Sequence, residues 1–157
     1  MQSKLGSWFP LSAGVLLAIT ALAKLISAFG RSEILQQYDP ILRMRYHWVF
    51  CLAAAMELGV VGVCFSRKDL PFKAGAIAWL ASLFLLYRLG LQWADYPAPC
   101  KCLGNLTDAL HISPVIASTI AKVILAYLLA GSYAVLFATW RSKLKDSPPF
   151  SSADGRQ

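Results

Sequence analysis

Two cysteines one residue apart, Cys100 and Cys102, have the types and spacing most typical of chemistry in this chain. The segment around them reads YPAPCKCLG, with prolines before the pair and a glycine after it. A disulfide between cysteines this close closes a small, strained ring, and strain makes a disulfide easier to reduce. Lys101 lies between the thiols and favours the thiolate, which is the reactive form. The pattern therefore predicts a redox-active pair.

Other roles for the cysteines stay open. Thiolates also bind soft metals such as Cu(I) or zinc, but only His47 and His111 add nitrogen ligands, and zinc normally takes four ligands. We assign no metal site. Cys51 is an alternative disulfide partner for the pair, or a second-site thiol that passes electrons. Cys64 is interpreted as an ordinary packed thiol.

Four ionisable residues lie inside apolar runs: Lys24, Glu57, Arg88 and Lys122. Charge is costly in hydrocarbon, so each is by default a functional-site hypothesis. At about 1.5 Å per helical residue, all four fall in the outer half of the membrane or at its floor. One carboxylate among three cations leaves excess positive charge, which suits an anion such as a thiolate, a quinolate or an anionic sulfur species. We therefore predict that these four residues bind a cofactor.

Structural explanations compete with that prediction. Lys24 and Arg88 are close enough to the interface to snorkel, with the charged end reaching water. Glu57 is too deep for that, and its alternative role is a structural ion pair with Lys24 or Lys122.

Composition identifies the class of protein. Of 157 residues, 57% are hydrophobic and only 15% are charged, and the mean hydropathy is +0.55. A soluble domain of this size carries more charge, so the sequence predicts an integral membrane protein with one domain. The net charge of +7 does not indicate nucleic acid, because the basic residues cluster at the ends of apolar runs, as topology signals do.

The apolar runs predict an all-α membrane protein, a four-transmembrane-helix bundle spanning residues 1–145. Each run is about 20 residues or longer, enough to cross a bilayer. The spans are expected at residues 9–29, 47–65, 72–93 and 114–140, with a disordered, Ser/Pro-rich tail at 146–157. A signal peptide cleaved after Ala23 is the alternative for the first run, but the apolar run continues past that site.

The distribution of Lys and Arg predicts the orientation. One face has Lys4, Arg67, Lys68, Lys73, Arg141, Lys143 and Lys145, whereas the other has only Arg31, Arg43, Arg45 and Lys101. The positive-inside rule then places both termini in the cytoplasm. The cysteine pair faces the periplasm or another exoplasmic space, where disulfide chemistry is permitted. We expect a multi-pass protein of the cell inner membrane.

Three elements together resemble the MauE branch of the DoxX-like membrane proteins, over about residues 11–140. They are Ala23-Lys24-Leu25, Glu57-Leu58-Gly59 and Cys100-Lys101-Cys102-Leu103-Gly104, with Leu103 where phenylalanine is expected. The resemblance implies a role in forming or maintaining disulfides in a periplasmic protein, and a link to quinones. The architecture is also similar to DsbB and vitamin K epoxide reductase, but their Cys-x-x-Cys pair is missing from this sequence.

These observations predict a membrane-embedded thiol–disulfide redox protein. Cys100 and Cys102 would exchange electrons with a periplasmic thiol or disulfide protein, and a quinone is the candidate cofactor. Lys24, Arg88 and Lys122 would stabilise a thiolate or the quinone, while Glu57 would hold the cations or relay protons. The alternatives are a non-catalytic membrane subunit with a structural disulfide, and a metal or anion carrier.

Overall fold

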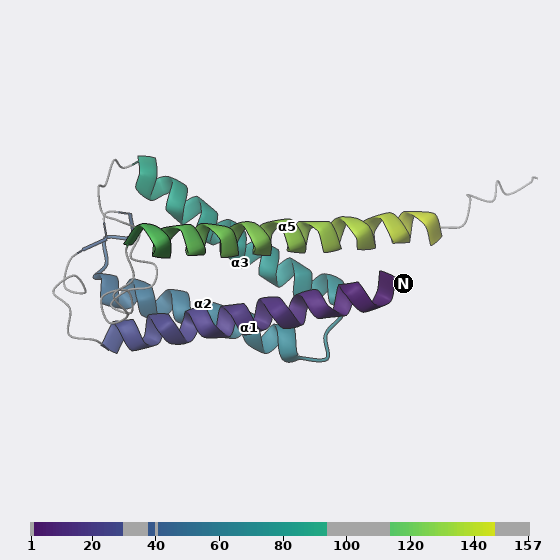
Figure 1. Cartoon of the computed structure of the whole chain (residues 1–157), viewed down its shortest axis with the longest axis horizontal. Helices are drawn as coiled ribbons and strands as arrows, with labels where there is room; N and C mark the ends of the chain where they lie inside the picture. Colours follow the sequence, from purple (N-terminus) through teal and green to yellow (C-terminus); the bar gives the residue numbers. More distant parts are fainter. Residues whose placement is uncertain (1, 30–37, 40, 94–113, 147–157) are drawn as a thin grey trace, which may run out of the picture.

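The computed structural model describes residues 2–29, 38–39, 41–93 and 114–146, and the cysteine pair Cys100–Cys102 lies outside these residues. Four helices make up most of the described chain: α1 (Gln2–Phe29), α2 (Tyr46–Phe65), α3 (Leu70–Trp93) and α5 (Pro114–Asp146). They run back and forth along one long axis, and α3 crosses that axis obliquely (Figure 1). Of the tail expected to be disordered at 146–157, Asp146 is the last residue of α5, and residues 147–157 lie outside the described residues.

All four helices are long and apolar enough to cross a membrane. The spans are Trp8–Phe29, Tyr46–Phe65, Leu70–Trp93 and Ser118–Leu144. This confirms the prediction of a multi-pass, four-helix membrane protein. All four helices are longer than their predicted spans, by one or two residues in α2 and α3 and by more in α1, which begins at Gln2, and α5, which ends at Asp146. An apolar pattern reports only the part of a helix inside the membrane, whereas arginine and lysine after Trp140 continue the helix well.

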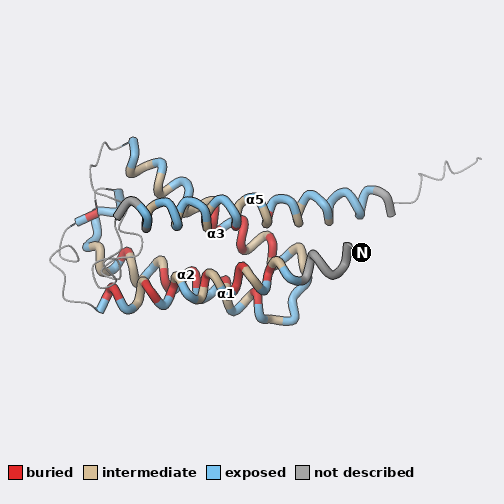
Figure 2. Tube along the Cα trace, in the orientation of Figure 1, coloured by how far each residue is buried: buried red, intermediate tan, exposed pale blue. Residues whose placement is uncertain are grey.

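Apolar side chains lie on the surface of the bundle as well as inside it, and alanine is frequent at the buried positions. Large apolar side chains such as Trp8, Leu86 and Phe137 are exposed, while Ala13, Ala21 and Ala54 are fully buried. Figure 2 shows the buried positions on the facing sides of α1 and α2 and along part of α3. Small residues let membrane helices approach closely, and large apolar ones face lipid tails at no cost.

The helices associate mainly as two pairs: α1 packs mostly on α2, and α3 mostly on α5. A shared core joins the pairs, with contributions from all four helices. Its buried members are Ala13, Leu17, Val60, Cys64, Ile77, Leu80, Ala81 and Leu128. A close approach of α5 to α1 adds to this core, because a side chain at Gly131 would overlap the ring of Phe9.

A compact turn closes the end of the bundle where α1 ends and α2 begins. Asp39 is 1% exposed, and its Oδ1 accepts hydrogen bonds from the backbone N–H groups of Ile41 (2.8 Å) and Leu42 (2.9 Å). Its Oδ2 accepts a hydrogen bond from the hydroxyl of Tyr87 on α3. Arg43 has a left-handed φ of 51°, which lets its N–H reach back to the Asp39 carbonyl. We call residues 38–39 and 41–45 the Asp39 turn, and the Tyr87 hydrogen bond fixes this turn to α3.

Candidate functional site

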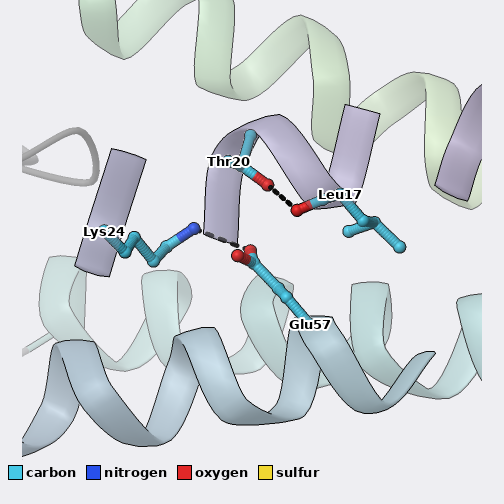
Figure 3. Close-up of polar contacts among 4 residues, drawn as sticks. All are labelled: Leu17, Thr20, Lys24 and Glu57. Carbon is cyan, nitrogen blue, oxygen red and sulfur yellow. Dashed lines mark hydrogen bonds and ion pairs between the residues drawn. The ribbon is translucent and has the colours of Figure 1, made fainter. Parts of the chain in front are cut away.

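A buried ion pair joins α1 to α2. The Nζ of Lys24 lies 2.6 Å from Oε1 of Glu57, and the two side chains are 12% and 2% exposed (Figure 3). At about 1.5 Å per residue, Lys24 lies about 7 Å from Phe29, the last residue of α1, and Glu57 lies about 16 Å from Tyr46, the first residue of α2. We call the end of the bundle at Phe29 and Tyr46 its loop end. The partner expected for Glu57 was Lys24 or Lys122, and the structure selects Lys24.

Helix direction explains how side chains at different depths meet. Every Cα–Cβ bond in a helix tilts toward the helix N-terminus. Because α1 and α2 are antiparallel, Lys24 points inward along the bundle and Glu57 points outward, so each reaches toward the other (Figure 3). Buried Ala54 and Ala21 leave room between the two helices for these side chains.

The ion pair is surrounded by groups from α1 and α3. The Lys24 Nζ lies 5.5 Å from the centroid of the Phe84 ring on α3, a cation–π distance. Thr20 lies beside the Glu57 carboxyl, but its hydroxyl donates to the backbone carbonyl of Leu17, 3.0 Å away (Figure 3). The site therefore combines one cation, one anion, one hydroxyl and one aromatic face.

One oxygen of Glu57 lacks a partner among the described residues. Its Oε2 is buried and accepts no hydrogen bond from them. Native structures rarely leave such an oxygen without a donor, because the desolvation penalty is about 1–3 kcal/mol or more for a charged group. The geometry therefore suits a hydrogen-bond donor, such as the adjacent Thr20 hydroxyl after rotation or the hydroxyl of a small molecule, or a proton carried by Glu57 itself.

Arg88 and Lys122 stand apart from this pair. Arg88 is half-buried, and its Nη2 donates to the backbone carbonyl of Ser118 on α5 at the long distance of 3.5 Å. Lys122 is exposed on α5. In the described chain Glu57 thus has one cation within ion-pair distance, not three. The prediction that Arg88 and Lys122 bind a cofactor stays a prediction.

A second polar contact lies near the loop end of α2. Cys51 Sγ is 3.9 Å from His47 Nε2, and His47 Nδ1 is 3.0 Å from the carbonyl oxygen of Ala28 on α1. From the sequence, His47 is a possible metal ligand and Cys51 a possible redox thiol, but the two were not predicted to act as a pair. Their spacing of four residues within one predicted helix was the signal that joins them.

Cys100 and Cys102 belong to the segment 94–113, outside the described residues, so their redox role stays a prediction. The helix ends that flank this segment are Trp93 of α3 and Pro114 of α5, and both lie at the end of the bundle where α2 begins (Figure 1). Within the described ranges, no group of three or more His, Cys, Asp or Glu residues is placed to hold a metal ion.

No family model matches the chain, and neither do any curated protein or solved structure that it was compared with. The resemblance to the MauE branch therefore rests on the sequence elements alone.

Proposed function

We propose that this chain is a multi-pass inner-membrane protein that exchanges thiols and disulfides on its outer face. Cys100 and Cys102 form the redox pair, and a periplasmic protein that carries a thiol or a disulfide is the partner. Both termini lie in the cytoplasm, which is the orientation that the Lys and Arg distribution favours. A membrane quinone is the candidate electron acceptor.

The observation that carries this proposal is the buried Lys24–Glu57 pair with its unpartnered carboxylate oxygen. It lies in the half of the bundle next to Trp93 and Pro114, the helix ends that flank the cysteine segment. Intramembrane charges are costly, so a buried carboxylate oxygen that is open to a donor is by default a functional-site hypothesis.

The residues of the site fit the chemistry of a quinone. Oxidation of two thiols to a disulfide releases two electrons and two protons, and a quinone, if bound, would supply the acceptor for both. Oε2 of Glu57 accepts a hydrogen bond from a hydroxyl or carries a proton, and Lys24 stabilises developing negative charge nearby. The Phe84 ring adds an aromatic surface beside Lys24.

The test is a redox titration of Cys100 and Cys102 in the purified protein, read by thiol alkylation. We expect a midpoint well above about −300 mV, below which structural disulfides typically lie. We also expect a ubiquinone analogue to reoxidise the reduced pair. Cys100→Ser/Cys102→Ser is the blank for the alkylation signal. A pair that stays oxidised below about −300 mV would overturn the redox proposal.

The short contact between Lys24 and Glu57 favours a second function, that of a non-catalytic membrane subunit. A 2.6 Å contact between α1 and α2 is what a non-catalytic membrane subunit would use to hold its helices together. The exchanged variant Lys24→Glu/Glu57→Lys separates the two. If the pair is only structural, the exchange preserves both folding and quinone-driven reoxidation. If the pair serves the redox reaction, folding survives and reoxidation is lost.

The third function is that of a metal or anion carrier, and bound metal would distinguish it from the other two. Metal analysis of the purified protein, with the cysteines found reduced, would favour it over both others.

A further inference from the structure

We infer that Cys51 is a third reactive thiol of this protein, with His47 as the acceptor of its proton and Ala28 as the group that orients the imidazole. The inference extends the proposed thiol–disulfide exchange to a site outside the Cys100–Cys102 segment. It stands on described residues alone and is tested without that segment.

The contact between the two side chains follows from their positions on α2. Residues four apart on a helix are neighbours on one face. His47 Nε2 lies 3.9 Å from Cys51 Sγ, a distance at which a thiol can donate to a nitrogen. The thiol is half-buried rather than sealed in the core. At about 1.5 Å per residue it lies about 7 Å from the start of α2, close to the aqueous phase.

The hydrogen bond to Ala28 on α1 determines which ring nitrogen of His47 can accept the thiol proton. The carbonyl oxygen of Ala28 can only accept a hydrogen bond, so His47 Nδ1, 3.0 Å away, is the donor. In the neutral ring the other nitrogen, Nε2, then has a lone pair, and this is the nitrogen that faces Cys51. A nucleophile, a base and a group that orients the base are thus arranged in series, as in nucleophilic catalysis.

The hydrogen bond from His47 also satisfies the backbone carbonyl of Ala28 at the end of α1. Ala28 is in the last turn of α1, where carbonyl groups lack a partner within the helix. His47 supplies that partner, so the imidazole is held by a bond that the end of the helix requires. The Trp48 ring meets the imidazole edge-on at 5.5 Å between centroids and limits its rotation further.

Cys64 is the other cysteine of α2, and its environment differs from that of Cys51. It is 4% exposed, belongs to the shared core, and lies at the opposite end of α2. Both are free cysteines, so one molecule contains a base-assisted thiol and a buried reference thiol.

The reaction that this geometry supports is exchange with a disulfide. Cys51 Sγ attacks one sulfur of a disulfide R–S–S–R′ and forms a new S–S bond to R, while the original S–S bond breaks. The thiol proton passes to His47 Nε2 and then to the leaving R′ sulfur. One disulfide is consumed and one is formed, so no further oxidant is needed. The co-reactant is a small disulfide or a protein disulfide at the membrane surface.

The experiment uses the full-length chain with Cys100→Ser/Cys102→Ser, so that Cys51 and Cys64 are the thiols left to react. The probe is 4,4′-dithiodipyridine, a small disulfide whose release of thiopyridone is followed by absorbance. We expect a fast phase and a slow phase, assigned to Cys51 and Cys64 by adding Cys51→Ser or Cys64→Ser. His47→Gln keeps a donor for Ala28 but removes the base, and should slow the fast phase by up to about 10-fold near pH 7.5, where an unassisted thiol is about one-tenth thiolate.

Two controls keep the inference open to refutation. The Cys64 rate reports folding, because a loosened core would raise it in any variant that is not native. If His47→Gln does raise it, His47→Ala with added imidazole replaces it, and added imidazole should restore the fast phase. A Cys51 rate that is unchanged by loss of the imidazole would overturn the inference. That result would leave the proposed role of Cys100 and Cys102 untouched, since neither is present in the assay.

Discussion

Glu57 and Lys24 show how strongly one residue depends on another inside a membrane. Glu57 is 1% exposed, and Lys24 is the cation that neutralises it. Removing one partner leaves the other charge buried and unpaired, which costs about 3–5 kcal/mol in comparable pairs. Replacing both partners with neutral groups avoids that penalty.

We therefore expect Lys24→Met to destabilise the protein by about 3 kcal/mol or more. The double variant Lys24→Met/Glu57→Gln should recover most of this loss. The unaltered protein, Lys24→Met, Glu57→Gln and the double variant form a double-mutant cycle. Thermal or denaturant unfolding in detergent measures the free energy of unfolding of each. Additive losses in the double variant would show that the two side chains do not interact.

Asp39 is the other buried carboxylate of the described chain, and Tyr87 is its side-chain partner. Tyr87→Phe removes a hydrogen bond to a charged group, which contributes about 1.5–3 kcal/mol. We expect the Asp39 turn to loosen, with faster hydrogen exchange at Ile41 and Leu42. Tyr133→Phe is the matched control, because that hydroxyl meets the neutral hydroxyl of Ser82, 3.1 Å away at an exposed position. Equal effects of the two variants would argue against a special role for Asp39.

Individual residues were predicted from sequence to different extents. An ion pair of Glu57 with Lys24 was one of two expected pairings, because a deep carboxylate must find a cation. The burial of Asp39 was not foreseen, because it depends on Tyr87, which lies far along the chain. No local pattern around Asp39 contains that information. Residues on one helix, such as His47 and Cys51, are easier to relate, since their spacing alone places them together.

At the scale of elements, apolar length predicted the four helices, but no periodic pattern predicted how they pair. A helix that lipid surrounds is apolar on every side, so its sequence lacks the polar stripe that marks the outer face of a soluble helix. The pairing of α1 with α2 and of α3 with α5 depends instead on where small residues permit close approach. Between the two pairs, Gly131 permits a close approach of α5 to α1, because the Phe9 ring occupies the space that a side chain would need.

We expect Gly131→Ala to destabilise the protein by about 1–3 kcal/mol, the usual cost of overpacking. The added methyl group overlaps the Phe9 ring. It should also disturb the neighbouring contact of Phe9 with Tyr127, whose ring centroids are 5.7 Å apart. Tryptophan or tyrosine fluorescence during thermal unfolding would measure the change.

Gly75→Ala on α3 is the control for this prediction. No atom lies within 4 Å of the position where its Cβ would be, so the substitution adds helix propensity without a clash. A second control, Gly131→Ala/Phe9→Leu, should recover part of the loss by vacating the ring. If Gly75→Ala and Gly131→Ala behave alike, the close approach of α5 to α1 is not important for stability.

At the scale of the whole molecule, the orientation in the membrane remains a prediction that one experiment checks. In a background without native cysteines, we expect Leu42→Cys to react with a membrane-impermeant maleimide on intact cells. Lys68→Cys, in the turn between α2 and α3, should react only after the membrane is opened. Both positions are exposed, so access to the reagent depends on the side of the membrane and not on burial. The reverse pattern would place the loop end in the cytoplasm.

The pairing of neighbours along the chain has a consequence for biogenesis. Each helix has as its main companion one that directly precedes or follows it among the four, and the Lys24–Glu57 bridge lies wholly within the first pair. A nascent chain that has released α1 and α2 already contains both opposite charges. The two helices can therefore leave the translocon as a neutralised hairpin, before α3 has entered the membrane. The lysine in the first span then never has to face lipid alone.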